Sequence, residues 1–381
     1  MIKLDQLIKT MCPNGVKYEK LNKLIDYIQP TKYIVSHTNY NNKYKTPVLT
    51  AGQTFILGYT DDESGIYHAS KENPVIIFDD FMTSNHWVDF DFKVKSSALK
   101  ILISTSKNNY KYIYYCIQNI NYKPKVHSRQ WISKYSEFTI PIPPLDVQNE
   151  IVNILDKFGE LEAELEAELE ARRSQYEFWR DKLLNNKKEK NNKKLKEIVI
   201  FENGKGHEKV VEESGEYILI TAKAISTNLK SVRKTNLQLS PLYKDDITLV
   251  MSDLPNGRAL AKCLYINEDN KYTLNQRVCK LKTNSEEIFP RYLYYFLDRN
   301  KQLLKYDNGV EQTNLKKDDI LNISVVIPPI NEQKRIVDIL DKFDRLINDI
   351  SIGLPAEIEA RRKQYEYYRN KLLNFEEVPN E

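Results

Sequence analysis

One motif occurs twice in this chain, and the duplication constrains the fold more than any other feature. IPPLDVQNEIVNILDKF at residues 142–158 returns as IPPINEQKRIVDILDKF at residues 327–343, with 11 of 17 positions identical. ARRSQYEFWRDKLLN at 171–185 returns as ARRKQYEYYRNKLLN at 360–374, with 11 of 15 positions identical. The offset grows from 185 to 189, so the second copy has four extra residues between its blocks. Different sequence precedes each copy, which indicates a fixed element placed after two variable ones.

Each copy predicts one long helix. Pro143–Pro144 and Pro328–Pro329 end the segment before it, and Asp146 and Asn331 are suitable N-cap residues. Apolar residues then recur at seven-residue spacing with occasional four-residue steps, as in a coiled coil. Gly353 and Pro355 predict a kink in the second helix. The predicted seam consists of Ile151, Phe158, Leu165, Leu169, Tyr176 and Leu183 in the first helix and Ile336, Phe343, Ile350, Ile358, Tyr365 and Leu372 in the second.

These helices are too long to be covered by one small domain. From Val147 to Leu184 the first helix would span about 55 Å at 1.5 Å per residue. Two such helices can bury their apolar stripes on each other, with an interleaved set at Leu161, Arg172 and Trp179 beside the seam. We expect antiparallel pairing, because the long globular segment between the helices lets the chain return.

A globular segment precedes each helix, and the two segments share a skeleton. KYIYYCI (111–117) parallels RYLYYFL (291–297), and KTPVLTAGQ (45–53) parallels EYILITAKA (216–224). Alternating apolar runs predict mixed α/β (α+β) domains. The predicted organisation is a first domain at 1–145, a central helix at 146–185, a polar basic linker at 186–197, a second domain at 198–330, a distal helix at 331–374 and a tail at 375–381.

Composition narrows the functional classes only a little. The 381 residues include 41% hydrophobic and 29% charged residues, as in a soluble globular protein, and no apolar run is long enough to cross a bilayer. The four cysteines form no CxxC pair and have no metal-ligand spacing with the five histidines. We therefore expect a cytoplasmic protein with reduced thiols and no metal site. A net charge of +4 permits a polyanionic partner without requiring one.

A duplicated unit whose copies pair produces pseudo-twofold symmetry. Two different globular domains on such an axis suit a double-stranded DNA target with two unlike half-sites at fixed spacing. A tandem scaffold whose domains bind proteins is the alternative, and the repeat alone does not decide between them.

The motif IPIPPLDVQNEIVNILDKF, the run ELEAELEAELEARRSQYEFWRDKLL and the second copy GLPAEIEARRKQYEYYRNKLL resemble the conserved regions of specificity subunits of type I restriction–modification systems. The similarity covers essentially the whole chain in order. It implies two target-recognition domains, each followed by a conserved helix. It also implies a non-catalytic DNA-recognition subunit that docks two methyltransferase subunits and recruits restriction (translocase) subunits.

The sequence agrees with a non-catalytic role. An adenine-N6 methyltransferase needs a [DNS]-PP-[YFW] loop, but the two PP pairs here precede Leu145 and Ile330. A phosphate-binding GxxxxGK[ST] loop is also missing from the sequence. We expect no cofactor in this chain, and S-adenosylmethionine, ATP and Mg²⁺ on the partner subunits.

The candidate DNA contacts are basic, amide and hydroxyl side chains in predicted loops. Arg pairs with guanine, Asn or Gln pairs with adenine, and basic side chains bind phosphates. Ordinary solvated surface positions are the alternative for each of them. The candidates are Lys43, Lys45, His127, Ser128, Arg129, Lys205, His207, Asn256, Arg258, Asn275, Gln276, Arg277, Gln312 and Asn314, with Thr313 beside the last two.

Three other patterns have simpler explanations. Asp79 and the pattern Asp91-x-Lys93 loosely fit the metal-binding residues of a metal-dependent nuclease. A half-exposed strand at 89–95, with Phe90, Phe92 and Val94 on one face, explains the same residues equally simply. YIYY (112–115) and YLYY (292–295) suggest base stacking, but their helical spacing favours core positions. ELEAELEAELEA (160–171) contains six Glu and no Lys, which suits a spacer held away from phosphates.

Two alternatives to the resemblance remain. One is a DNA-recognition subunit of another restriction–methyltransferase enzyme, or an unpartnered competitor. The other is the protein-binding scaffold, which predicts no salt-sensitive affinity for DNA.

Overall fold

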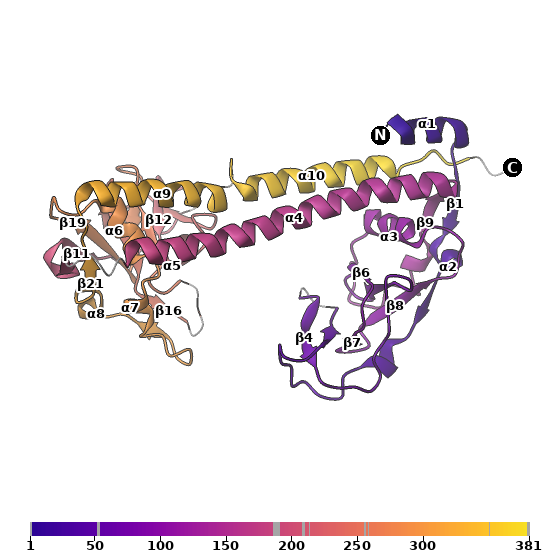
Figure 1. Ribbon diagram of the computed structural model, residues 1–381, viewed down its shortest axis with the longest axis horizontal. Helices are drawn as coiled ribbons and strands as arrows, with labels where there is room; N and C mark the ends of the chain where they lie inside the picture. The colour runs from indigo at the N-terminus through magenta and orange to yellow at the C-terminus, as the bar shows by residue number, and fades with distance from the viewer. Residues whose placement is uncertain are drawn as a thin grey trace. The chain divides into compact units, whose positions relative to one another are not determined.

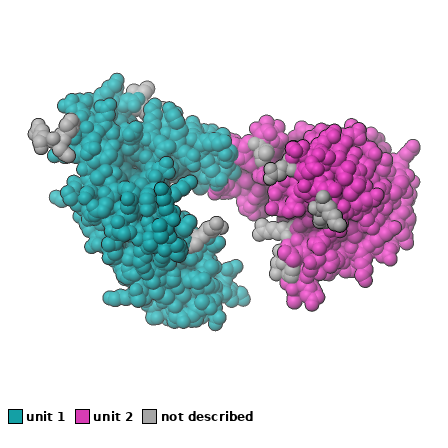
Figure 2. Space-filling model, turned by 180° about the vertical axis from the view of Figure 1, so that it is seen from behind, with its two compact units in different colours: residues 1–165, 358–381 teal, residues 166–357 magenta. Residues whose placement is uncertain are grey.

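The computed structural model of the chain describes residues 2–51, 54–185, 191–207, 210–212, 214–254, 257, 259–349 and 351–378. The chain divides into two compact units, coloured separately in Figure 2. Unit 1 consists of Met1–Leu165 and Ile358–Glu381, and unit 2 of Glu166–Glu357. Each unit therefore combines a globular part with portions of the two conserved helical regions. Among the described residues, no helix is both long and apolar enough to cross a membrane.

The globular part of unit 1 contains two main sheets. The strand order β2-β8-β5-β6 is antiparallel throughout, and in the order β4-β3-β7 the pair β3 and β7 is parallel. A separate ladder pairs β1 with β9. The elements are α1 (Ile2–Met11), β1 (Lys17–Lys20), α2 (Leu21–Leu24), β2 (Ile25–Ile28), η1 (Pro30–Tyr33), β3 (Thr46–Leu49), β4 (Ile56–Thr60), β5 (Val75–Asp79), β6 (Asn85–Val88), β7 (Lys93–Val94), β8 (Leu99–Ser104), α3 (Tyr110–Asn119), η2 (Tyr135–Glu137) and β9 (Thr139–Ile142).

Unit 2 repeats this topology with different side chains. The order β11-β19-β15-β17 corresponds to β2-β8-β5-β6, and the parallel pair β12 and β18 corresponds to β3 and β7. The elements are β10 (Asn192–Lys194), η3 (Leu195–Glu197), β11 (Val199–Asn203), β12 (Tyr217–Ile220), α5 (Ala222–Ser226), β13 (Arg233–Thr235), β14 (Pro241–Leu242), β15 (Ile247–Val250), β16 (Ser252–Asp253), β17 (Cys263–Tyr265), β18 (Tyr272–Leu274), β19 (Val278–Thr283), α6 (Pro290–Leu297), α7 (Lys301–Leu304), β20 (Thr313–Asn314), α8 (Lys317–Leu321) and β21 (Ser324–Val326).

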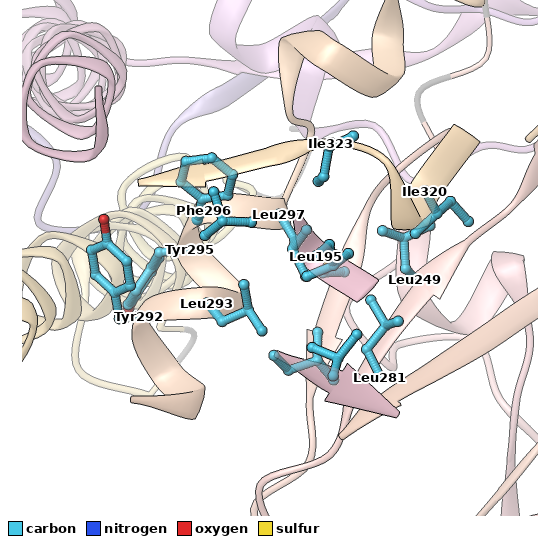
Figure 3. Close-up of a cluster of buried hydrophobic side chains, with 14 of the residues drawn as sticks. Leu195, Leu249, Leu281, Tyr292, Leu293, Tyr295, Phe296, Leu297, Ile320 and Ile323 are labelled. Atoms are coloured by element: carbon cyan, nitrogen blue, oxygen red, sulfur yellow. The ribbon is translucent and has the colours of Figure 1, made fainter. Parts of the chain in front are cut away.

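The central strands are apolar runs buried on both faces. Every residue of β5 (VIIFD) and of β15 (ITLV) is buried, because each strand lies between two neighbours and under a helix. In unit 2, Leu249 of β15 and Leu281 of β19 meet Leu293 of α6 in the core (Figure 3). Tyr112 and Tyr115, like Tyr292 and Tyr295, are buried, so the prediction that YIYY and YLYY are core residues is confirmed for these four.

Figure 1 shows α3 beside the first part of the conserved helix that follows it, and α6 beside the second conserved helical region. Corresponding hydrogen bonds join each globular part to its helix. In unit 1 the buried Gln148 accepts from Asn109 N at 2.9 Å and donates to Asn108 Oδ1 and Pro143 O, both at 2.8 Å. The Tyr115 hydroxyl of α3 donates to Asp156, whose carboxylate lies 3.0 Å from Lys111 Nζ.

Unit 2 has a corresponding junction, in which the backbone carbonyl of Glu287 takes the place of the Asn108 side chain. Gln333 accepts from Phe289 N at 2.8 Å and donates to Glu287 O at 2.7 Å and Pro328 O at 2.8 Å. The Tyr295 hydroxyl donates to Asp341, which also accepts from Arg291 at 2.9 Å. Burial, and then the neighbouring carboxylate, raise the pKa of both Tyr115 and Tyr295, which keeps these hydroxyls as donors. The repeated motif therefore encodes a docking site for the preceding domain.

The first conserved helix, α4 (Leu145–Leu184), is continuous over 40 residues. The second is interrupted, with α9 at Ile330–Asn348 and α10 at Leu354–Leu372, so the predicted single kinked helix is wrong. Gly353 lies where an added Cβ would be 2.5 Å from Arg345 O, and Asp349 accepts the backbone N–H groups of Ser351 and Ile352. This turn ends α9 instead of bending it.

The predicted seam side chains are buried or partly buried wherever the structure describes them. In unit 1, Ile151 is fully buried and Phe158 stacks on Tyr368 with ring centroids 5.4 Å apart. In unit 2, the Tyr176 and Phe343 rings lie 6.3 Å apart. Ile350 lies outside the described residues. The interleaved positions Leu161 and Trp179 are exposed. The next residue in each case, Glu162 and Arg180, is partly buried, because the buried face of α4 passes through these positions.

Three further expectations need correction. Both helices begin one residue before the predicted caps: Val147 N donates to Pro144 O, and Pro329 is the N-cap of α9, so Asp146 and Asn331 lie in the first turn. Residues 192–197 are not a linker, since β10 pairs with β21 and Leu195 is fully buried.

The tail prediction also fails for 375–378. Tyr18 Oη donates to Phe375 O at 2.8 Å, and Val378 N donates to Val16 O at 3.1 Å. The predicted domain boundaries otherwise stay predictions.

Candidate nucleic-acid interface

In unit 1, a turn after β5 and the loop before η2 meet at one end of the central strand. Asp79 Oδ1 accepts from Phe81 N at 2.8 Å and Met82 N at 3.0 Å, which closes the turn. Asp80, 1% exposed, accepts from Gln130 N at 3.1 Å and Trp131 N at 2.8 Å, which fixes the loop. We call residues 79–83, 98–100 and 126–131 edge cluster 1.

Edge cluster 1 presents three of the predicted contacts together. The His127 ring stacks on Phe81 with centroids 4.8 Å apart, and the Arg129 guanidinium lies 5.8 Å from the same ring. Ser128 lies between them, and all three side chains are exposed. Arg129 Nη1 is 3.3 Å from Asp80 Oδ2, so a buried carboxylate orients an exposed cation.

A second cation lies behind that carboxylate. Lys100, 3% exposed, has its Nζ 3.8 Å from Asp80 Oδ2 and donates to Gln29 Oε1 at 2.5 Å. Burial lowers the pKa of Lys100, and the Asp80 charge opposes that effect. Asp79, Asp80 and Lys100 are all buried, so the charge that edge cluster 1 presents to solvent is that of Arg129, which favours an anionic partner.

Unit 2 has an equivalent arrangement. Met251 N donates to Arg277 O at 2.9 Å, and Leu315 N donates to Met251 O at 2.7 Å. In unit 1, Asp80 N donates to Ala98 O at 3.1 Å, and Gln130 N donates to Asp80 O at 2.7 Å. We call residues 251–254, 277 and 310–315 edge cluster 2.

This equivalence aligns Gln312-Thr313-Asn314 with His127-Ser128-Arg129. Gln312 Nε2 donates to Ser252 Oγ at 2.9 Å and to Asn314 Oδ1 at 3.2 Å, while Thr313 pairs with Asp253 in the β16–β20 ladder. Arg277, Gln312 and Asn314 are exposed, and Thr313 is buried. The structure therefore brings three predicted contacts of unit 2 together at edge cluster 2.

Other predicted contacts lie apart from the edge clusters or are buried. Lys43 and Lys45 are exposed on the segment that leads into β3, in the second sheet of unit 1. Lys205 bridges to Asn275, where an added Cβ on Gly204 would lie 2.0 Å from Asn275 O.

The prediction that His207 contacts a phosphate is wrong, because its side chain is buried. Its ring is 1% exposed, with Nδ1 2.7 Å from Lys205 O and Nε2 3.2 Å from Thr273 Oγ1. Its backbone N–H donates to Asn275 Oδ1, so the amide proposed to face DNA fastens this loop. Gln276 is exposed next to Arg277.

Asn256 and Arg258 lie outside the described residues, but the ends of their loop are visible. Asp253 accepts from Leu254 N at 2.9 Å, Ala259 N at 2.6 Å and Leu260 N at 3.1 Å. Asp253 thus holds Ala259 and Leu260 close to the end of β16, as Asp80 holds Gln130 and Trp131 close to the end of β5. Sequence reasoning missed both aspartates; their only signal was a position just after a buried apolar strand.

The residues of the nuclease pattern have other partners. Asp91 Oδ2 lies 2.8 Å from His68 Nδ1, while Asp79 closes its turn. Lys93 is 1% exposed and pairs with Asp62 at 2.9 Å, which corrects the expectation of a half-exposed strand. Within the described ranges, no group of three or more His, Cys, Asp or Glu side chains is placed to hold a metal.

The chain matches the family model described as "Type I restriction modification DNA specificity domain" twice, at residues 13–171 and 187–360. It is 40% identical to the Escherichia coli type I restriction enzyme EcoR124I/EcoR124II specificity subunit, with 98% of each chain covered. It is 30% identical to a putative type I restriction enzyme specificity subunit of Haemophilus influenzae, covering 85% of this chain and 86% of that one.

The fold also has solved counterparts. A type I restriction–modification S subunit from M. genitalium has a TM-score of 0.55 and 16% identity, with 95% of this chain and 97% of that chain covered. A chain from a structure of type I R-M complex assembly has a TM-score of 0.57 and 12% identity, with 95% and 98% covered. The family model matches both halves of the sequence, and the relatives match nearly its whole length. The chain therefore belongs to the family of type I restriction–modification DNA specificity subunits.

Proposed function

We propose that each unit recognises one half of an asymmetric two-part site in double-stranded DNA, through edge cluster 1 in one unit and edge cluster 2 in the other. The observation that carries this proposal is that the two clusters share backbone hydrogen bonds but differ in their exposed side chains. Arg129 and Arg277 suit guanine or phosphate, and Gln312 and Asn314 suit adenine. Unlike side chains on equivalent frameworks predict unlike half-sites.

The two conserved helical regions would pair as an antiparallel coiled coil that sets the gap between the half-sites. Contacts within each unit support this. In unit 1 the first part of α4 contacts the last part of α10, where Arg362 Nε donates to Glu162 at 2.6 Å. In unit 2 the last part of α4 contacts α9 through Tyr176 and Phe343. This order of contacts is the one expected of antiparallel helices.

Catalysis would reside on other subunits of the complex. We place the S-adenosylmethionine-dependent methyltransferase on two docked subunits, and ATP and Mg²⁺ on the restriction subunits, with the assembly in the cytoplasm. Methylation of adenine requires the base to leave the helical stack, and its pocket would be on the methyltransferase partner.

The decisive experiment is adenine-N6 methylome sequencing of a methylation-free host that expresses this chain with its own methyltransferase subunit. The expected result is an asymmetric two-part motif with a fixed gap that disappears when this chain is omitted. Methylation at an unchanged motif without this chain would refute the proposal. Stable complex formation without salt-sensitive DNA binding would support a protein-binding scaffold instead.

The length of α4 provides a second test. Deleting Glu164–Ala167 removes about 6 Å of helix, against about 3.4 Å per base pair of duplex. We expect the gap to shorten by about one or two base pairs, with both half-sites unchanged. Altered half-sites with an unchanged gap would show that the helix does not set the spacing.

A further inference from the structure

Each edge cluster displays two apolar side chains to solvent. In unit 1 these are Met82, 66% exposed, and Val126, 70% exposed. In unit 2 they are Leu254, 68% exposed, and Val310, 77% exposed. Single exposed apolar side chains are common on protein surfaces, so what distinguishes these four is that each lies within an edge cluster, beside the predicted contacts.

The two pairs lie in matching parts of the edge clusters, one on the turn and one on the loop. Met82 follows Phe81, whose ring stacks on His127, the residue after Val126. Leu254 follows the β16 pair, in which Ser252 accepts from Gln312, two residues after Val310. The backbone hydrogen bonds that match Asp80 to Met251 and Gln130 to Leu315 align Met82 with Asp253 and Val126 with Glu311, so Leu254 and Val310 each lie one residue from the aligned position.

Fixed backbone geometry presents these side chains. Met82 N donates to Asp79 Oδ1 at 3.0 Å, and Leu254 N donates to Asp253 Oδ1 at 2.9 Å. In the loops, Val126 O accepts from Ser128 N at 2.9 Å, and Val310 N donates to Asn308 Oδ1 at 2.9 Å. A backbone already held by hydrogen bonds loses little further conformational entropy on binding, which suits a contact that must discriminate.

The charges nearby favour a polyanion over an apolar protein surface as the partner. Val126 lies in a run whose exposed side chains include Lys123, Lys125, His127 and Arg129. Exposed Arg277 is held beside the turn of Leu254, because its carbonyl accepts from Met251 N. In unit 1, the cations around the apolar tip match phosphates around the bases of a groove; in unit 2, Arg277 supplies the cation, and the exposed Glu311 follows Val310.

We propose that Met82 with Val126, and Leu254 with Val310, contact the bases of the duplex and determine part of each half-site. This inference rests on the proposed function and names residues that were absent from the polar candidates. The apolar groups of a duplex are thymine methyls in the major groove and base faces at an opened step. Covering a side chain of this size should strengthen binding about tenfold at a matching half-site.

The test compares methylomes of a methylation-free host expressing the full chain with its methyltransferase subunit. The variants are Met82→Ser and Leu254→Ser, with the exposed Met11→Ser and Leu237→Ser as matched controls. Met82→Ser should relax or change one half of the motif, with about tenfold lower methylation at the original sites. Leu254→Ser should affect the other half, and the controls should leave both halves unchanged.

A conservative variant separates recognition from folding. Met82→Leu keeps an apolar tip and should retain the original half-site, whereas a folding defect in Met82→Ser would reduce methylation without changing the motif. An unchanged motif and occupancy in both serine variants would overturn the inference, as would equal effects of Met82→Leu and Met82→Ser. A wild-type chain that directs no two-part motif would overturn the proposed function, and the inference with it.

Discussion

Gln148 offers a sharp test of how a globular part is fastened to its helix. Replacing Gln148 with Ala removes the partner of Asn109 N, Asn108 Oδ1 and Pro143 O in a place where the side chain is 1% exposed. A buried polar group left unsatisfied costs about 1–3 kcal/mol. Some of the three groups will find water or each other, so we expect the free energy of unfolding of unit 1 to fall by about 2–4 kcal/mol.

Hydrogen exchange measured peptide by peptide suits a chain of two units, because a single unfolding transition need not describe both. At about 1.4 kcal/mol per factor of ten, the protection of α3 amides should fall by roughly 30- to 700-fold in Gln148→Ala, while α6 keeps its protection. Gln333→Ala should give the reverse pattern, because Gln333 makes the corresponding bonds in unit 2.

The matched control is Gln175→Ala. Gln175 is exposed on α4 and its amide oxygen accepts from Arg172 Nη1 at 2.9 Å, so we expect a change below about 0.5 kcal/mol. Equal exchange in Gln148→Ala and Gln175→Ala, or equal losses in both units, would refute the reasoning.

Three further predictions concern the stability and reactivity of the chain. Gly353→Ala should lower the melting temperature, because its Cβ would lie 2.5–2.8 Å from three carbonyl oxygens, whereas Gly159→Ala, with no atom within 4 Å, should raise it by helix propensity. The backbone N–H of Ser36, and then Lys93, hold the pKa of Asp62 below its ordinary value of 3.8. Asp62 therefore stabilises unit 1 above about pH 4, and this stabilisation is lost as the pH falls further. The urea midpoints at pH 6 and pH 3 should differ less in Asp62→Asn than in wild type. Equal differences in the two proteins would contradict this role of Asp62. Burial raises the pKa of the Cys116 thiol to about 12, and all four cysteines are buried. A thiol reagent at pH 8 should therefore label the native chain far more slowly than the unfolded chain. Rapid labelling of the native chain would contradict this burial.

The repeated motif allowed much of the fold to be predicted, because helix periodicity is a local property of sequence. The burial of Ile151, Ile336, Ile358 and Leu372, and of tyrosines in α3 and α6, follows from apolar spacing alone. The break at Gly353 did not follow, since it depends on how three carbonyl oxygens of the preceding turn approach that residue. Burial of Leu195 was hidden by its charged neighbours, and strand pairing with β21, distant in sequence, decided its place.

The candidate site was less predictable, because its geometry is made by residues that do not resemble contacts. Loop position identified His127, Arg129 and Gln312, but it also selected His207, whose ring is buried. The aspartates that shape the loops, Asp80 and Asp253, act through backbone N–H groups that no sequence pattern displays. The exposure of apolar side chains such as Met82 and Val310 does not follow from sequence, because their apolar character predicts burial.

The matching junctions at Gln148 and Gln333 also create a problem of assembly. A nascent first domain meets two nearly identical docking sites, about 36 and about 220 residues beyond Tyr112. The chemistry of the sites barely distinguishes them, but closing the longer loop costs about 1.6 kcal/mol more in chain entropy. Synthesis from the N-terminus adds to this preference, because the near site leaves the ribosome first. Chain order, in place of side-chain complementarity, keeps each domain on its own helix and protects a duplicated protein from misassembly.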